Sequence, residues 1–190
     1  MERIGELIAQ SHNPLVWAGH GIRLARERER FKAFIERTKL PFVTTWGGAD
    51  LMPTDHPGNI GIVGVCGQRG ANRAVAECDF LLVLGSHLSV SQTGPAESFA
   101  PHARRIAVVD IDQEELDHLR VGVYTRICAP LKDFFDWTEH PAAAGWQPCL
   151  PWLQYLGQCK ETNSPPSEGS YAFNAAMTSI LPPGTTMVVD

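Results

Sequence analysis

Three glycine loops of this chain have the composition of a phosphate-binding site. Gly19-His20-Gly21 follows an apolar run, Gly64 to Gly70 precedes a helical pattern, and Gly85-Ser86-His87 closes the most apolar segment. Loops of this kind let backbone amides approach an anion closely. The first loop lacks the third glycine of the dinucleotide fingerprint, because Leu24 occupies that position. A tight turn therefore explains the first two loops as well as contact with a nucleotide does.

Two aspartates after another apolar run could bind a sugar. Asp110 and Asp112 follow the run from Ile106 to Val109, at the place where nucleotide-binding sheets accept a pair of ribose hydroxyls. Asp112 could instead cap a helix, because Glu115 stands three residues later. Both roles are compatible, with Asp110 or the backbone of Ile111 on the ligand and Asp112 on the helix.

These residues make a binding site without an evident catalyst. A nucleophile elbow, a P-loop lysine and paired carboxylates at a strand end are all missing. His87 could contact a phosphate, although a lone histidine more often packs or lies at the surface. The cysteines are odd in number and widely spaced, which indicates buried free thiols and supports neither a disulfide framework nor a metal site. They are Cys66, Cys78, Cys128, Cys149 and Cys159.

Alternating strands and helices must position these residues. Apolar runs predict strands at 14–19, 41–45, 80–84, 105–112 and, at an edge, 125–128. Helical patterns cover about 24–38, 71–77, 114–119 and 131–139. In the first helix, Leu24 shares the apolar face with Phe31, Phe34 and Ile35.

Strands that are apolar throughout are covered on both faces. We therefore predict an α/β fold, namely a doubly wound, mostly parallel Rossmann-like sheet with helices on both faces. Ligands of such sheets bind at the carboxyl ends of the strands, which here carry Gly19, Thr45, Gly85 and Asp110.

The composition changes after residue 140. Half of the 14 prolines lie within residues 141–190. We expect a central nucleotide-binding-like domain at 1–140 and a proline-rich interdomain linker at 141–169, with a short helix near 151–160. Residues 170–190 would then form the first helix and strand of a truncated second domain.

Charge and composition exclude several classes of protein. The chain has 190 residues, a net charge of -5 and 44% hydrophobic residues, as expected of a soluble globular protein. A mildly acidic chain is a poor partner for nucleic acid. The sequence contains neither the roughly 20 apolar residues of a membrane span nor a secretory signal. We expect a cytoplasmic protein without a membrane partner.

The order of these segments resembles the central domain of thiamine-diphosphate-dependent enzymes of the acetolactate synthase type. The likeness covers about residues 1–140 and, more faintly, 170–190. The segments that carry it are Trp17-Ala18-Gly19-His20-Gly21, Pro41-Phe42-Val43-Thr44-Thr45, Gly61-Ile62-Val63-Gly64, Ala71-Asn72-Arg73-Ala74-Val75, Cys78 to Gly85, and Val108-Val109-Asp110-Ile111-Asp112.

The resemblance implies a subunit in which this domain lies between two others. In the family, the flanking domains hold thiamine diphosphate and Mg²⁺, so the chain alone is expected to be inactive. The complete enzyme would be a homo-oligomer that decarboxylates a 2-keto acid such as pyruvate and transfers the acyl unit to a carbonyl acceptor.

The resemblance also implies a ligand for the central domain, which holds FAD in some members and an ADP-containing ligand or nothing in others. His87 and Ser91 stand where acetolactate synthases carry arginines, and Ala129-Pro130 replaces a Gly-Asp. Fewer permanent positive charges beside a diphosphate weaken its binding. The FAD contacts that the resemblance implies are Gly19, His20, Gly21, Thr45, Trp46, Gly64, Gly85, Ser86, His87, Asp110 and Ile111.

Two other classes of protein share such a sheet. One is a non-catalytic assembly module that binds ADP or coenzyme A in the same cleft. The other is a sirtuin-like NAD-dependent deacylase, which usually carries a zinc module, and the cysteine spacing disfavours it.

Overall fold

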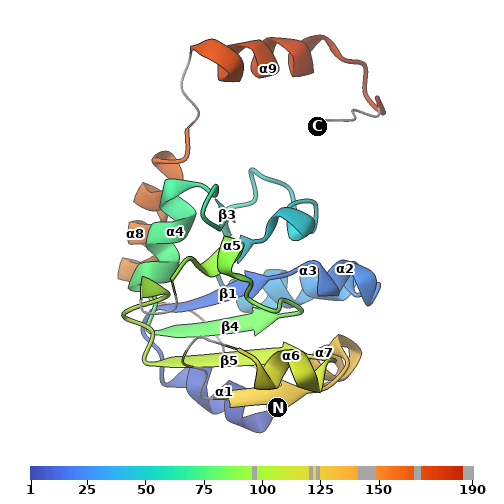
Figure 1. Cartoon of the computed structure of the whole chain (residues 1–190), viewed down its shortest axis with the longest axis vertical. Helices are drawn as coiled ribbons and strands as arrows, with labels where there is room; N and C mark the ends of the chain where they lie inside the picture. Colours follow the sequence, from blue (N-terminus) through green and yellow to red (C-terminus); the bar gives the residue numbers. More distant parts are fainter. Residues whose placement is uncertain (96–97, 120–121, 123–124, 141–148, 165–167, 186–190) are drawn as a thin grey trace.

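The computed structural model describes residues 1–95, 98–119, 122, 125–140, 149–164 and 168–185. Its centre is a six-stranded sheet in the order β3-β2-β1-β4-β5-β6 (Figure 1). Each of the described strand pairings is parallel. The strands are β1 (Pro14–Ala18), β2 (Phe42–Thr44), β3 (Asn59–Ile62), β4 (Phe80–Leu84), β5 (Arg105–Asp110) and β6 (Thr125–Cys128).

Helices follow most of the strands, which confirms the predicted doubly wound α/β fold. They are α1 (Glu2–Ala9), α2 (Gly21–Leu24), α3 (Arg28–Thr38), the 3-10 helix η1 (Trp46–Gly48), α4 (Arg69–Glu77), α5 (Val90–Thr93), α6 (Gln113–Asp117), α7 (Leu131–Thr138), α8 (Leu150–Glu161) and α9 (Gly169–Ile180).

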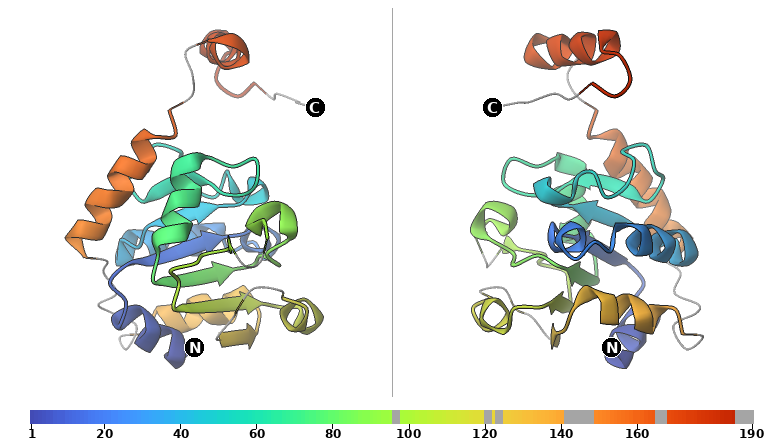
Figure 2. Two further views of the ribbon diagram at one scale, coloured as in Figure 1. Left: turned by 60° about the vertical axis from the view of Figure 1, so that its left-hand side comes forward. Right: turned by 90° about the vertical axis from the view of Figure 1, so that its right-hand side faces the viewer.

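Two hydrophobic cores cover the two faces of the sheet (Figure 2). Alternate strand residues point to opposite faces, so Val16 and Leu82 pack under α1, α3 and α7, whereas Trp17 and Val83 pack under α4 and α8. Because both faces are buried, β1 and β4 have no exposed residue. This explains why their sequences are apolar throughout.

The helix predicted from Leu24 is wrong at its start. The chain forms the short α2 and breaks at Arg26, whose φ is 62°. Ile22, and not Leu24, fills the core together with Phe31 of α3. Nine residues apart on one continuous helix, Ile22 and Phe31 would point about 180° away from each other. The break lets both reach the core and leaves Leu24 72% exposed.

Three further elements were not predicted: α1, the short α5 and the edge strand β3. The strand contributes buried Ile60 but also Gly61, whose φ is 126°, and its register with β2 shifts between Phe42 and Val43. Such a strand has no apolar run that sequence reasoning could detect. Of the cysteines, Cys78 and Cys159 are buried as predicted, whereas Cys66, Cys128 and Cys149 are exposed and that prediction was wrong for them.

The helix α8 follows the predicted position near 151–160 and packs against α4 and β3. Trp152 is buried, and its Nε1–H donates to the carbonyl oxygen of Pro14 at 2.9 Å. Tyr155 stacks on Trp152 with ring centroids 5.6 Å apart. At the end of this helix, Asn163 accepts a hydrogen bond from the backbone N–H of Gly70 at 2.8 Å. The described part of the predicted linker is therefore joined to the sheet by specific contacts.

The last described helix, α9, lies apart from the sheet in Figures 1 and 2. All of its residues are exposed, including Tyr171, Phe173 and Ile180. The strand predicted at Met187 to Val189 lies outside the described residues.

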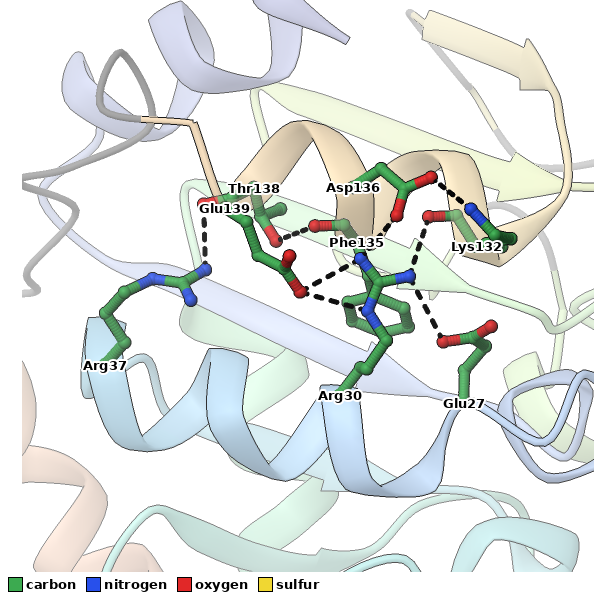
Figure 3. Close-up of polar contacts among 8 residues, drawn as sticks. All are labelled: Glu27, Arg30, Arg37, Lys132, Phe135, Asp136, Thr138 and Glu139. Carbon is green, nitrogen blue, oxygen red and sulfur yellow. Dashed lines mark hydrogen bonds and ion pairs between the residues drawn. The ribbon is translucent and has the colours of Figure 1, made fainter.

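An arginine cluster holds α3 against α7 (Figure 3). The guanidinium of Arg30 donates to Asp136 at 2.7 Å and to Glu139 at 3.0 Å, and it also pairs with Glu27 at 3.6 Å. Its Cζ lies 5.9 Å from the centroid of the Phe135 ring. One planar cation thus satisfies three carboxylates, a geometry that a lysine does not reproduce.

We expect Arg30→Met to destabilise the chain by about 1 kcal/mol, because methionine keeps the contact with Phe135 but leaves the carboxylates without their shared cation. The loss should shrink in high salt, which screens exposed charges. Urea unfolding at two salt concentrations measures both effects. Arg3→Met is the matched control, since Arg3 makes one exposed ion pair with Glu6. An equal loss in both variants would contradict the cluster.

The same substitution has a predictable pH dependence. Hydrogen bonds from Lys132 and Arg30 lower the pKa of Asp136 below its usual value. A carboxyl with a lowered folded-state pKa stabilises the protein above its unfolded pKa, and this contribution disappears as pH falls through the folded value. The difference between wild type and Arg30→Met should therefore be constant near neutral pH and shrink below about pH 4.

Candidate functional site

A cleft of about 740 Å³ opens at the carboxyl ends of the central strands. Its lining comes from the segments that follow β1, β4, β5 and β6. The strand order reverses between β1 and β4, and ligands of open α/β sheets bind at this reversal, the topological switch point. We call this cavity the switch-point cleft. It includes six of the predicted site residues, namely His20, Gly21, Gly85, His87, Asp110 and Ile111.

The glycines at the floor of the switch-point cleft touch one another. The N–H of Gly21 donates to the carbonyl oxygen of Gly85 at 2.9 Å. A Cβ on Gly19 would lie 2.1 Å from the same oxygen, and Gly85 has a φ of 60°. Close packing of the two loops thus requires these glycines whether or not a ligand is bound, and Gly19 itself is buried behind the cleft.

Two aspartates shape the opposite side. Oδ1 of Asp112 accepts the N–H groups of Glu114 and Glu115 at 2.9 and 3.3 Å, which confirms it as the cap of α6. Oδ1 of Asp110 accepts the N–H of Asp112 at 3.1 Å. Each carboxylate keeps a second oxygen, so a contact between Asp110 and a ligand hydroxyl remains a prediction.

The remaining predicted site residues lie elsewhere. Gly64 borders a second cavity of about 220 Å³, which shares no lining residue with the switch-point cleft. Ser86 is buried, where its hydroxyl accepts from the indole of Trp17 at 3.2 Å and donates to Gln92 at 3.1 Å. Thr45 is buried and Trp46 is 69% exposed, and neither lines these two cavities.

The two histidines have different surroundings. His20 is exposed, and its Nδ1 lies 2.8 Å from the carbonyl oxygen of Gly47. That carbonyl can only accept, so Nδ1 carries the proton when this hydrogen bond forms. His87 is exposed at the cleft.

Several lining residues were missed by sequence reasoning. Glu27 comes from the break between α2 and α3, which was not predicted, and Lys132 comes from the first turn of α7. Pro130 follows β6, so the rule that ligands bind at carboxyl ends could have found it. Glu115 lines the cleft from α6, where the sequence had assigned it to capping.

The chemistry available in the cleft is binding. Among the residues that the structure describes, no group of three histidine, cysteine or acidic side chains could hold a metal ion. The apolar side chains of Leu24, Ile111 and Leu131 offer a surface for a flat ring, and Asp110 offers an acceptor for hydroxyl groups. A diphosphate fits less well, because Lys132 is the only permanent cation among the described lining residues.

The strand order, the crossing glycine loops and the cleft at the switch point define a nucleotide-binding-like α/β domain. A model of the thiamine pyrophosphate enzyme central domain matches residues 1–136. The chain belongs to this family, whose enzymes use thiamine diphosphate.

Curated relatives are large subunits of acetolactate synthases. The chain is 29% identical over 173 residues to "Acetolactate synthase isozyme 2 large subunit" of Escherichia coli K12, with 79% of this chain and 31% of the relative covered. It is 38% identical over 116 residues to "Probable acetolactate synthase large subunit" of Methanocaldococcus jannaschii, covering 61% and 20%. For "Acetolactate synthase 1, chloroplastic" of Zea mays the values are 34% over 132 residues, 70% and 20%. The chain thus spans a fifth to a third of these relatives.

A search of the described helices for a long apolar segment found none that could cross a membrane.

Proposed function

We propose that this chain is the central domain of a longer, homo-oligomeric subunit that decarboxylates a 2-keto acid such as pyruvate and transfers the acyl unit to a carbonyl acceptor. The observation that carries the proposal is the family match over residues 1–136. The names of the relatives, all acetolactate synthases, support the reaction class.

In this proposal the chemistry belongs to thiamine diphosphate, which stabilises the carbanion formed on decarboxylation. Flanking domains would hold that cofactor and its Mg²⁺. The residues of this chain position those domains through the rigid sheet and its two buried cores. Residues 170–190 would open the following domain, which is supported by the exposed apolar side chains of α9.

The test is to express the complete gene product that contains this chain and to follow pyruvate consumption with thiamine diphosphate and Mg²⁺ added or withheld. We expect turnover only when both are present, and none from the 190-residue chain. Gel filtration with light scattering gives the oligomeric state. A gene product without thiamine-diphosphate-dependent turnover of any 2-keto acid would overturn the proposed reaction.

A second function concerns the cleft itself, which we propose binds an adenine nucleotide. Its place at the switch point and the free oxygen of Asp110 favour this role. FAD and ADP are the candidate ligands. Titrating the chain with each, and looking for flavin absorbance that survives gel filtration, separates them, and binding of neither would leave a purely structural domain.

A further inference from the structure

Carboxylates dominate the switch-point cleft. Glu27, Asp110, Asp112 and Glu115 face one ammonium group, Lys132, so the described lining has a formal charge of -3 with both histidines neutral. Nζ of Lys132 already pairs with Asp136, which lies outside the lining, at 2.5 Å. The single cation is therefore partly neutralised by a carboxylate before any ligand arrives.

This charge acts against a diphosphate. A carboxylate about 7 Å from a dianion weakens its binding by roughly two- to sevenfold, depending on salt. Several such groups act together here, and no arginine is found among the described residues of the lining to offset them. A ligand without phosphate does not meet this repulsion.

The loop after β4 adds an obstacle for an extended dinucleotide. His87 lines the switch-point cleft, whereas Gln92 lines the separate cavity beside Gly64. The loop is held by a hydrogen bond from the N–H of Val65 to the carbonyl oxygen of Ser91 at 3.0 Å. A ligand reaching from Asp110 to Gly64 would have to displace these contacts.

The cleft does offer a site for a smaller ligand. Leu24 and Ile111, which are 72% and 71% exposed, both line it. Apolar side chains so open to water gain from being covered by a flat ring. Asp110 keeps one oxygen for hydroxyl groups, a charged acceptor that strengthens such hydrogen bonds.

We propose that the switch-point cleft binds an uncharged nucleoside, with the base against Leu24 and Ile111 and the sugar hydroxyls on Asp110, and that it does not hold FAD. The inference deepens the proposed nucleotide role of the cleft by naming the ligand class. It is independent of keto-acid turnover, which the complete subunit reports separately.

Calorimetry of the full chain with adenosine, ADP and FAD at low and moderate salt tests the proposal. We expect adenosine to bind at least as tightly as ADP, and FAD to be lost on gel filtration. Asp110→Asn should weaken adenosine about tenfold, since asparagine keeps the acceptor for Asp112 but loses the charge. Glu115→Gln should strengthen ADP about two- to sevenfold and leave adenosine unchanged.

Glu161→Gln on α8 is the matched control, because Glu161 is exposed and does not line the cleft. It should change none of the affinities. FAD retained in stoichiometric amount, ADP bound more tightly than adenosine, or no binding of adenosine at millimolar concentration would each overturn the proposal. Loss of keto-acid turnover in the complete subunit would leave these binding results unaffected, so the two proposals fail separately.

Discussion

Gly19→Ala is expected to destabilise the chain by about 3 kcal/mol or more, enough to unfold a domain of marginal stability. The new Cβ would lie 2.1 Å from the carbonyl oxygen and 2.6 Å from the carbonyl carbon of Gly85. Both atoms belong to the backbone, which cannot move aside like a flexible side chain. The neighbouring strands β1 and β4 pair along their whole length at the centre of the sheet, so a shift would spread through both cores.

Gly157→Ala is the matched control for this prediction. A Cβ on Gly157 meets nothing within 4 Å, and alanine is the better helix former in the middle of α8. We expect it to raise the free energy of unfolding by about 0.5–1 kcal/mol. Urea unfolding followed by circular dichroism measures both variants. If Gly19→Ala unfolded at the wild-type midpoint, the loops after β1 and β4 would not lie as close as the structure places them.

The central strands could be predicted from the sequence because both of their faces are buried. A residue such as Val83 has no solvent-exposed neighbour in β4, so the apolar run marks the strand directly. The edge strand β3 and the break at Arg26 could not be found in this way. They depend on how distant segments pack, since Ile22 rather than Leu24 reaches the core next to Phe31.

The candidate site was predictable only in part. The rule that ligands bind at carboxyl ends correctly grouped Gly21, Gly85 and Asp110. It also grouped Ser86 with them, although that side chain turns inward to Trp17. Sequence alone could not distinguish a glycine that admits a phosphate from one that admits another loop. Nor could it place the charge of Glu27 in the cleft, because that position depends on the break before α3.

The second large effect concerns α8. We expect Trp152→Ala to destabilise the chain by about 3–5 kcal/mol, the usual cost of removing a buried tryptophan. The indole is 3% exposed, stacks on Tyr155 and donates to the carbonyl oxygen of Pro14 at 2.9 Å. Its loss leaves a cavity over the start of β1 and a backbone acceptor without this partner. Urea unfolding gives the size of the effect.

Leu153→Ala is the control, because Leu153 is 40% exposed on the same helix, and it should cost less than about 1 kcal/mol. Hydrogen exchange then shows what Trp152 does. If α8 is part of the folded domain, its amides in wild type should exchange as slowly as those of α4, against which it packs. Trp152→Ala should release α8 before the sheet unfolds. A variant as stable as wild type, with unchanged exchange in α8, would mean that this helix crosses the surface as a linker without stabilising the domain.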